Sequence, residues 1–348
     1  MTTHSNPIIL GTGLLSLDLV IGSDPTSGVR AWAGGTCGNV LCILSSLGWT
    51  AHPVARLGRD AASVQIRNDL TRWKVGLDFV RDSDRVETPI IVQEIRKDRD
   101  GEIRHRFSWS CPKCGGWLPR FRPVTREVVA RVSPYLGGAS VFFMDRLSRA
   151  ALQLAHEAAN RGAIVMYEQS AKSDARLVNE VLRIAHVIKY ADDRIESIDG
   201  VTAPHSSVLV EIRTEGFRGL SYRHRSYRHR LRRTVSEWMH LDAIPASSTI
   251  DTCGAGDWCT AGFLASIGTL GLSGLMHAGA RGLRAALRYG QTLAALNCAF
   301  EGARGFMYSP SYSDQVSAPF AISAPLEGVL LPFKCPACPM ADAEAAAQ

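Results

Sequence analysis

Long uncharged runs are scarce in this chain of 348 residues, which bears first on membrane segments. Trp258–Ala280 is one of two stretches of more than 20 residues without Asp, Glu, Lys or Arg, and it holds five glycines and His277. A buried core helix and its turn explain that composition better than a transmembrane span. Met1–Asn6 is polar, and Pro7–Leu10 is too short for the apolar region of a signal peptide. We therefore expect a cytoplasmic protein with no membrane segment.

Two common phosphate-binding motifs are also missing. The chain has no Gly-x-x-x-x-Gly-Lys-Ser/Thr sequence, which excludes a P-loop protein. Gly11-Thr-Gly13 lacks the third glycine of a dinucleotide-binding fingerprint, because Ser16 stands at that position.

The net charge of +6 does not reflect a generally basic protein. Arg218–Arg233 holds seven arginines and no acid, and the rest of the chain is close to neutral. This basic stretch fits a solvated hairpin, since charge runs are usually exposed faces. It also fits contacts to nucleotide phosphates, to a phosphorylated substrate or to nucleic acid, with Tyr stacking beside Arg. The sequence does not decide among these, and nucleic acid is the least favoured partner.

The features that are present are those of a globular α/β protein, with 46% hydrophobic and 21% charged residues. Apolar strands alternate with helices, which predicts a mainly parallel central sheet with helices on both faces. The predicted strands are Ile8–Leu10, His52–Leu57, Ser140–Met144, Ala163–Tyr167, His186–Lys189 and Ser207–Ile212. The predicted helices are Asn39–Leu47, Ala61–Trp73, Ser148–Arg161, Asp174–Ile184, Trp258–Ile267 and Leu283–Phe300. Pro89–Arg96 and Glu102–Ser108 interrupt the alternation and predict a small antiparallel lid.

The most specific motif is Asp251-Thr-Cys-Gly254-Ala255-Gly256-Asp257, which opens the predicted helix from Trp258. Small residues allow the backbone to approach a ligand, and N–H groups at a helix N-terminus attract an anion. Asp257 stands at the same place, so its carboxylate can meet a hydroxyl beside a bound phosphate. On spacing alone, a Gly-rich turn followed by an Asp that interacts with the dipole at the helix N-terminus is an equal reading. If the turn binds an anion, this one segment supplies both a phosphate-binding site and a base, which are the main protein groups that phosphoryl transfer needs.

This motif resembles the Asp-Thr-x-Gly-Ala-Gly-Asp signature of the ribokinase/PfkB family of sugar and nucleoside kinases. Further segments agree with the family in order and spacing across most of the chain. They are Gly13-x4-Asp18, Gly34-Gly35-Thr-Cys-Gly-Asn39 with Leu47-Gly48, Leu57-Gly58-Arg-Asp60, Thr214-Glu-Gly216-Phe-Arg-Gly219 and Gly302-Ala303.

The resemblance implies one Rossmann-like ribokinase domain over residues 1–348, with a lid formed by about 18–33 and 85–110. It implies ATP and Mg²⁺ as cofactors, Asp257 as the general base, and an anion hole formed by Gly254, Ala255 and Gly256. It implies that the substrate contacts Asp18, Gly35 and Asn39, although Asn39 as a helix N-cap is an equal reading. It implies that the ATP site includes Thr214, Gly216, Gly219 and Gly302. A homodimer through the lid is left open.

The chain departs from the family where a metal-organising Asn-x-x-Glu follows the strand His186–Lys189. Ala191 and Arg194 stand in place of that Asn and Glu, so Asp192 or Asp193 would have to substitute. Glu168 stands near a family Asp and is read either as a supporting acid or as a solvated strand end.

Two Cys-Pro-x-Cys pairs stand out among nine cysteines, an odd number that disfavours a disulfide framework. Cys111 and Cys114 lie in a Cys-rich loop, 111–123, and Cys335 and Cys338 lie in the C-terminal tail, 333–348. Two such knuckles match a closed, structural Zn²⁺ site with four thiolates. Free thiols and two redox-active pairs are the alternatives.

The sequence therefore predicts an ATP-dependent kinase that phosphorylates a hydroxyl of a sugar. A nucleoside kinase of the same fold is the nearest alternative. A zinc-stabilised, non-catalytic protein that binds a ligand or nucleic acid is a third, motivated by Ala191, Arg194 and the basic stretch.

Overall fold

The computed structural model describes residues 6–22, 29–97, 103–170, 172–195, 198–228 and 232–312. Cys335, Cys338 and the tail 333–348 lie outside these residues.

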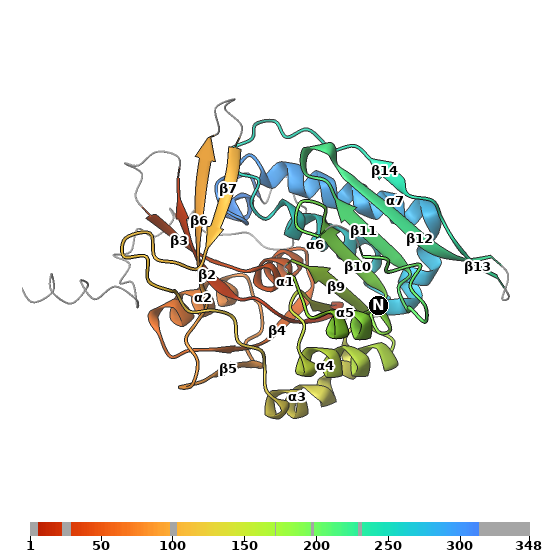
Figure 1. Cartoon of the computed structure of the whole chain (residues 1–348), viewed down its shortest axis with the longest axis horizontal. Helices are drawn as coiled ribbons and strands as arrows, with labels where there is room; N and C mark the ends of the chain where they lie inside the picture. The colour runs from red at the N-terminus through yellow and green to blue at the C-terminus, as the bar shows by residue number, and fades with distance from the viewer. Residues whose placement is uncertain are drawn as a thin grey trace, which may run out of the picture.

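A ten-stranded sheet forms the centre of the molecule (Figure 1). Its order is β13-β12-β11-β10-β9-β8-β1-β4-β5, with β14 paired to β12. The neighbours from β11 through to β5 are parallel, and β12, β13 and β14 join antiparallel at one edge. The bounds are β1 Ile8–Thr12, β4 Thr50–Leu57, β5 Val80–Asp82, β8 Val141–Met144, β9 Ile164–Gln169, β10 Val187–Ala191, β11 Val210–Thr214, β12 Leu220–Arg228, β13 Arg232–Val235 and β14 Met239–Leu241. The expected α/β fold with a mainly parallel sheet is confirmed.

Helices cover both faces of this sheet because its strands alternate apolar side chains between two cores. Ile9 and Val141 pack in one core, whereas their neighbours Leu10 and Phe142 pack in the other. The first core includes residues of α1 Thr36–Ser46, α2 Ala61–Arg72, α6 Ala255–Ile267 and α7 Gly271–Asn297. The second includes residues of α3 Arg126–Val132, α4 Arg149–Asn160 and α5 Ala175–Leu182. Short 3₁₀ helices are η2 Ser133–Gly138, η3 Gly216–Arg218 and η4 Gly305–Tyr308.

A second sheet of four strands, the small sheet, stands beside the central one at the left of Figure 1. Its order is β3-β2-β6-β7, with bounds β2 Ser16–Ile21, β3 Val29–Gly34, β6 Ile90–Lys97 and β7 Ile103–Ser108. β2 pairs with β3 and β6, and β6 pairs antiparallel with β7. The antiparallel pair predicted from Pro89–Arg96 and Glu102–Ser108 thus extends into a larger sheet.

The C-terminal helices differ from expectation in their bounds. α7 begins at Gly271 rather than near Leu283, and Gly279 breaks its helical backbone with a φ of 59°. In the described part of the chain, no single helix is long and apolar enough to cross a membrane; α6 and α7 would pass together on length and composition, but they are bent by 101°.

Candidate active site

The motif Asp251–Asp257 forms the turn into α6 as the sequence predicts. Gly254 is the N-cap residue, with φ 75° in the left-handed region. A Cβ added there would lie 2.2 Å from the backbone oxygen of Ala303, so only glycine fits. The first-turn N–H groups of a helix have no partners within it, and here they belong to Ala255, whose N–H lies 3.3 Å from the Thr252 backbone oxygen, and to Gly256 and Asp257. The turn therefore presents donors that suit an anion.

The buried Asp251 carboxylate holds this turn in place through two hydrogen bonds from backbone N–H groups. Its Oδ1 accepts a hydrogen bond from the Cys253 N–H at 2.7 Å, and its Oδ2 accepts one from the Gly302 N–H at 2.9 Å. Gly302 is thereby fixed against the motif, with φ 91°. The small sheet also contacts the motif, because His105 Nε2 lies 2.9 Å from Thr252 Oγ1.

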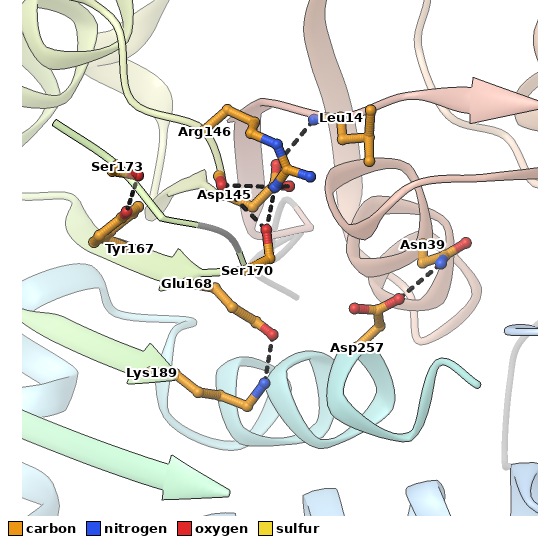
Figure 2. A network of polar contacts seen from close by, with 10 residues as sticks. All are labelled: Leu14, Asn39, Asp145, Arg146, Tyr167, Glu168, Ser170, Ser173, Lys189 and Asp257. Carbon is orange, nitrogen blue, oxygen red and sulfur yellow. Dashed lines mark hydrogen bonds and ion pairs between the residues drawn. The ribbon is translucent and has the colours of Figure 1, made fainter. Parts of the chain in front are cut away.

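Asp257 is buried at the start of α6 and faces α1 (Figure 2). Asn39 donates from Nδ2 to Asp257 Oδ2 at 2.7 Å. Burial, and secondly the nearby Glu168 carboxylate, raise the pKa of Asp257 to about 7, while the Asn39 hydrogen bond and Lys189 oppose the rise. A carboxylate with a pKa near neutral pH is suited to general-base catalysis.

Asn39 is not the N-cap of its helix. Gly35 holds that position, and Asn39 lies in the first turn of α1. Its amide joins two segments distant in sequence, since Nδ2 bonds Asp257 and Oδ1 accepts from Arg304 Nε at 3.0 Å. The reading of Asn39 as a capping residue is therefore wrong.

Asp18 and Gly35, the other predicted substrate residues, lie together where β2 meets the end of β3. Asp18 Oδ1 accepts from Ser16 Oγ at 2.6 Å. Burial raises the pKa of Asp18 to about 6, against the hydrogen bonds from Ser16 and the Gly35 backbone. Gly35 has φ 82°, and a Cβ there would lie 2.4 Å from the Leu14 backbone oxygen. The structure thus brings Asp18 beside Gly35 and Asn39 beside Asp257.

The predicted ATP residues fall in two places. Thr214 ends β11, and Gly216 and Gly219 form the turn into β12 with φ values of 60° and 109°. Gly302 lies instead against Asp251. Asp192, one candidate substitute for the metal-organising residues, lies at the β11 turn, where its carboxylate pairs with Arg218 and its N–H donates to the Thr214 backbone oxygen.

A buried ion pair lies beside Gly256, a residue of the predicted anion hole, and was not predicted from the sequence (Figure 2). Lys189 Nζ lies 2.5 Å from Glu168 Oε1 and donates to the Gly256 backbone oxygen at 3.1 Å. Thr260 donates to the other carboxylate oxygen of Glu168 at 2.6 Å. Glu168 is buried, so its reading as a solvated strand end is wrong. The available signal was a lysine inside an otherwise apolar strand.

Asp145 is a second missed acid, at the carboxyl end of β8. It accepts from the Leu14 N–H at 2.9 Å and pairs with Arg146 at 2.6 Å. Burial raises the pKa of Asp145 to about 6, and its charge in turn raises the pKa of Asp257. Its place at the end of a parallel strand was the signal, because ligands of α/β sheets bind at that edge.

Part of the basic stretch is committed to internal contacts. Arg223 bonds Glu211 at 2.9 Å, and Arg225 donates to the backbone oxygens of Ser206 and Val201. Trp238 packs under Arg223, with 4.6 Å between the guanidinium carbon and the ring centre. The stretch forms β12 and β13 at the edge of the sheet, which matches the expected hairpin.

The first cysteine pair forms a tight turn. The Gly115 N–H donates to the Cys111 backbone oxygen at 2.9 Å, and the Cys111 N–H donates to Gly116 at 2.8 Å. No group of three or more His, Cys, Asp or Glu side chains in the described residues could hold a metal ion. The predicted zinc site is therefore not supported there, and Cys335 and Cys338 lie outside the described residues.

Comparison with known proteins gives one consistent result. A family model described as pfkB family carbohydrate kinase matches residues 22–309. The comparison with curated proteins gave no match.

Solved structures share the fold at low sequence identity. Ribokinase from Arabidopsis thaliana, complexed with ribose and ATP, is 17% identical with a TM-score of 0.62, over 86% of this chain and 94% of that one. A nucleoside kinase from Burkholderia thailandensis, in complex with inosine, is 18% identical with a TM-score of 0.60, over 88% and 93%. An uncharacterised sugar kinase from Pyrococcus horikoshii is 14% identical with a TM-score of 0.66, over 90% and 97%.

Proposed function

Since the chain belongs to the pfkB family of carbohydrate kinases, we propose that it transfers the γ-phosphoryl group of ATP to a hydroxyl of a sugar. The observation that carries the proposal is the position of Asp257. This carboxylate lies in the first turn of α6, bonds Asn39 at 2.7 Å, and has a pKa raised to about 7.

In the proposed reaction, Asp257 takes the proton of the acceptor hydroxyl while the oxygen of that hydroxyl forms a bond to the γ-phosphorus of ATP. The bond between that phosphorus and the β–γ bridging oxygen breaks, and ADP leaves. The N–H groups of Gly254, Ala255 and Gly256 stabilise the negative charge on the transferred group. Asp18, Gly35 and Asn39 orient the acceptor, and Thr214, Gly216, Gly219 and Gly302 bind the nucleotide.

The family implies Mg²⁺, but two of the carboxylates considered as its ligands among the described residues are already paired with positive charges. Glu168 is bonded to Lys189, and Asp192 is paired with Arg218. Mg²⁺ often enters kinase sites mainly through substrate phosphates, and it would supply charge neutralisation there.

A nucleoside acceptor is the second candidate. It is favoured by two aromatic rings near Asp18, since Trp32 and Tyr308 have ring centres 5.1 Å apart and could stack on a base. The test is an ADP-release assay with D-ribose, D-fructose and inosine, with the product identified by mass spectrometry. Asp257→Asn serves as the inactive control. A wild-type protein that binds ATP but phosphorylates no sugar or nucleoside would favour the non-catalytic alternative.

We also propose that Cys111, Cys114, Cys335 and Cys338 hold a structural Zn²⁺ that joins the loop 111–123 to the tail 333–348. The tight turn at Cys111 and its exposed neighbour Cys114 support the first knuckle.

A further inference from the structure

A small cavity lies between the small sheet and the segment after α7. Eight residues line it: Asp18, Val20, Trp32, Ala33, Gln93, Ala303, Arg304 and Tyr308. It adjoins the anion hole, because Gly254 packs directly on Ala303. Two of these residues carry a buried donor with no hydrogen-bond partner among the described residues, namely Arg304 NH1 and Trp32 Nε1, although the Arg304 side chain also lies against the Cys42 thiol, where it opposes the rise that burial causes in the thiol pKa.

Arg304 is held rigidly by its other nitrogens. Its side chain is buried, with the residue 4% exposed. Nε donates to Asn39 Oδ1 at 3.0 Å, and NH2 donates to the Ala33 backbone oxygen at 2.6 Å and to Asp69 Oδ2 at 2.5 Å. A guanidinium fixed at Nε and NH2 cannot turn NH1 elsewhere. A buried charged donor without an acceptor is costly, so this geometry suits a ligand oxygen.

The charges around the cavity indicate an uncharged ligand. Asp69 neutralises Arg304, to which it is ion-paired at 2.5 Å. Asp18 faces the same cavity, and since its pKa is raised to about 6, it is mostly ionised at neutral pH. Asp18, Arg304 and Asp69 together then carry one net negative charge, although Asp69 lies behind the lining, and this charge repels a carboxylate or phosphate on the ligand. A carboxylate acceptor beside two fixed donors matches a group of neighbouring hydroxyls.

We propose that Arg304 and Trp32 determine acceptor specificity by donating hydrogen bonds to two oxygens of an uncharged, polyhydroxylated acceptor. Asp18 accepts a hydrogen bond from a hydroxyl of the same molecule. This inference rests on the proposed function for its catalytic meaning, but it concerns binding and can be measured without turnover.

The same contacts give Arg304 a positioning role. By donating to Asn39 Oδ1, it forces the Asn39 amide to present Nδ2 to Asp257. Asp257, Asn39 and Arg304 form one hydrogen-bonded chain from the base to the cavity. A purely structural role for Arg304 is therefore the competing explanation, and the test must separate the two.

Trp32→Phe is the decisive variant because it removes one donor and keeps an aromatic ring. Trp73→Phe is its matched control. Trp73 also packs on Tyr308, and its Nε1 also lacks a partner among the described residues, but it does not line the cavity. Arg304→Lys, which keeps the charge, is the second variant.

The measurements are calorimetric Kd values for D-ribose, D-fructose, inosine and the anionic probe D-gluconate, followed by KM and kcat. We expect Trp32→Phe to weaken binding of the best neutral acceptor about threefold to tenfold, the usual effect of one lost hydrogen bond. Arg304→Lys should weaken it about tenfold or more. KM for ATP should stay unchanged in Trp32→Phe, and Trp73→Phe should bind like wild type.

One deoxy analogue sharpens the result. Wild type should lose affinity for an analogue that lacks the hydroxyl bound by Trp32, whereas Trp32→Phe should bind that analogue and the parent acceptor equally. Equal effects of the two Trp variants, tighter wild-type binding of gluconate than of neutral acceptors, or no binding of any of the four would overturn the inference. Specific binding without phosphorylation would instead overturn the proposed function and leave the inference standing.

Discussion

Replacing Glu168 by Gln removes a negative charge that raises the pKa of Asp257. The same change leaves Lys189 without its anionic partner, so the positive charge beside Gly256 also favours ionised Asp257. Both effects act in one direction. For two charges about 10 Å apart in a medium with an effective dielectric constant of about 20, the interaction is about 1.7 kcal/mol. That energy corresponds to about one pH unit.

The sign follows from the role of Asp257 as a base. In the proposed role, activity requires the ionised form of Asp257 and should fall as pH decreases through its pKa of about 7. In Glu168→Gln, the midpoint of the acid limb should move toward about pH 6. The ionised fraction at pH 6 then rises from about a tenth to about a half, so activity relative to the plateau rises about fivefold.

The assay is the pH profile of kcat/KM for the acceptor between pH 5 and 9, on protein whose folding is checked by circular dichroism. Lys189→Met is the control of opposite sign, because loss of the cation should move the acid limb to higher pH. Either variant leaves a buried charge unpaired, which destabilises the fold by about 3–5 kcal/mol. The midpoint of the pH profile is a property of the molecules that remain folded, so it can still be measured. An unchanged limb in Glu168→Gln, or shifts of the same sign in both variants, would refute the assignment.

Four further predictions concern the base, the turn, the metal and the link between the metal and the acceptor site. Asp257→Asn should lower kcat about 10²-fold or more while calorimetry shows ATP binding largely kept, and near-normal turnover would contradict its role as the base. Gly254→Ala should lower the melting temperature and weaken ATP binding, because a Cβ at this φ of 75° would lie 2.2 Å from the Ala303 backbone oxygen. Gly48→Ala is the control, since a Cβ there would have no neighbour within 4 Å, and it should leave ATP binding intact. Purified protein should contain about one Zn per chain by atomic emission, and Cys335→Ser should lower both metal content and melting temperature; metal-free protein of unchanged stability would exclude this site. Cys114→Ser should raise KM for the acceptor more than Kd for ATP, because Cys111 follows the small sheet closely, and equal losses would indicate general destabilisation instead.

Ala191 and Arg194 differ from the Asn and Glu of the family motif, and the segment that they bound lies close to a positively charged side chain and to the small sheet. Asp192 is paired with Arg218 at the end of β11, and Arg194 lies with its guanidinium 6.0 Å from the ring centre of Phe107 in β7. Positively charged side chains thus accompany the predicted nucleotide residues where the family places an acid. This arrangement makes the dependence on Mg²⁺ concentration an informative comparison between this chain and its relatives.

Local sequence was sufficient wherever the signal is carried by neighbouring residues. The motif Asp251–Asp257 predicted a turn into a helix, and α6 begins at Ala255. Alternating apolar strands and helices predicted the parallel sheet, because each strand must bury both faces. The start of α7 was misplaced, since glycines at its N-terminal end weakened the helical pattern before Leu283.

Tertiary contacts decided what the side chains do. Asn39 and Asp257 are 218 positions apart, and Asn39 and Arg304 are 265 apart, so no local pattern could reveal that they form one hydrogen-bonded chain. The predicted strand His186–Lys189 ended at Lys189 and gave no sign of a partner for its charge. Only the folded chain places the Glu168 carboxylate and the Gly256 backbone oxygen around the Lys189 ammonium group. The sequence alone determined that Asp257 would start a helix at a Gly-rich turn. Its pKa near 7 depends on burial and on charges from other strands, which exist only once the chain has folded.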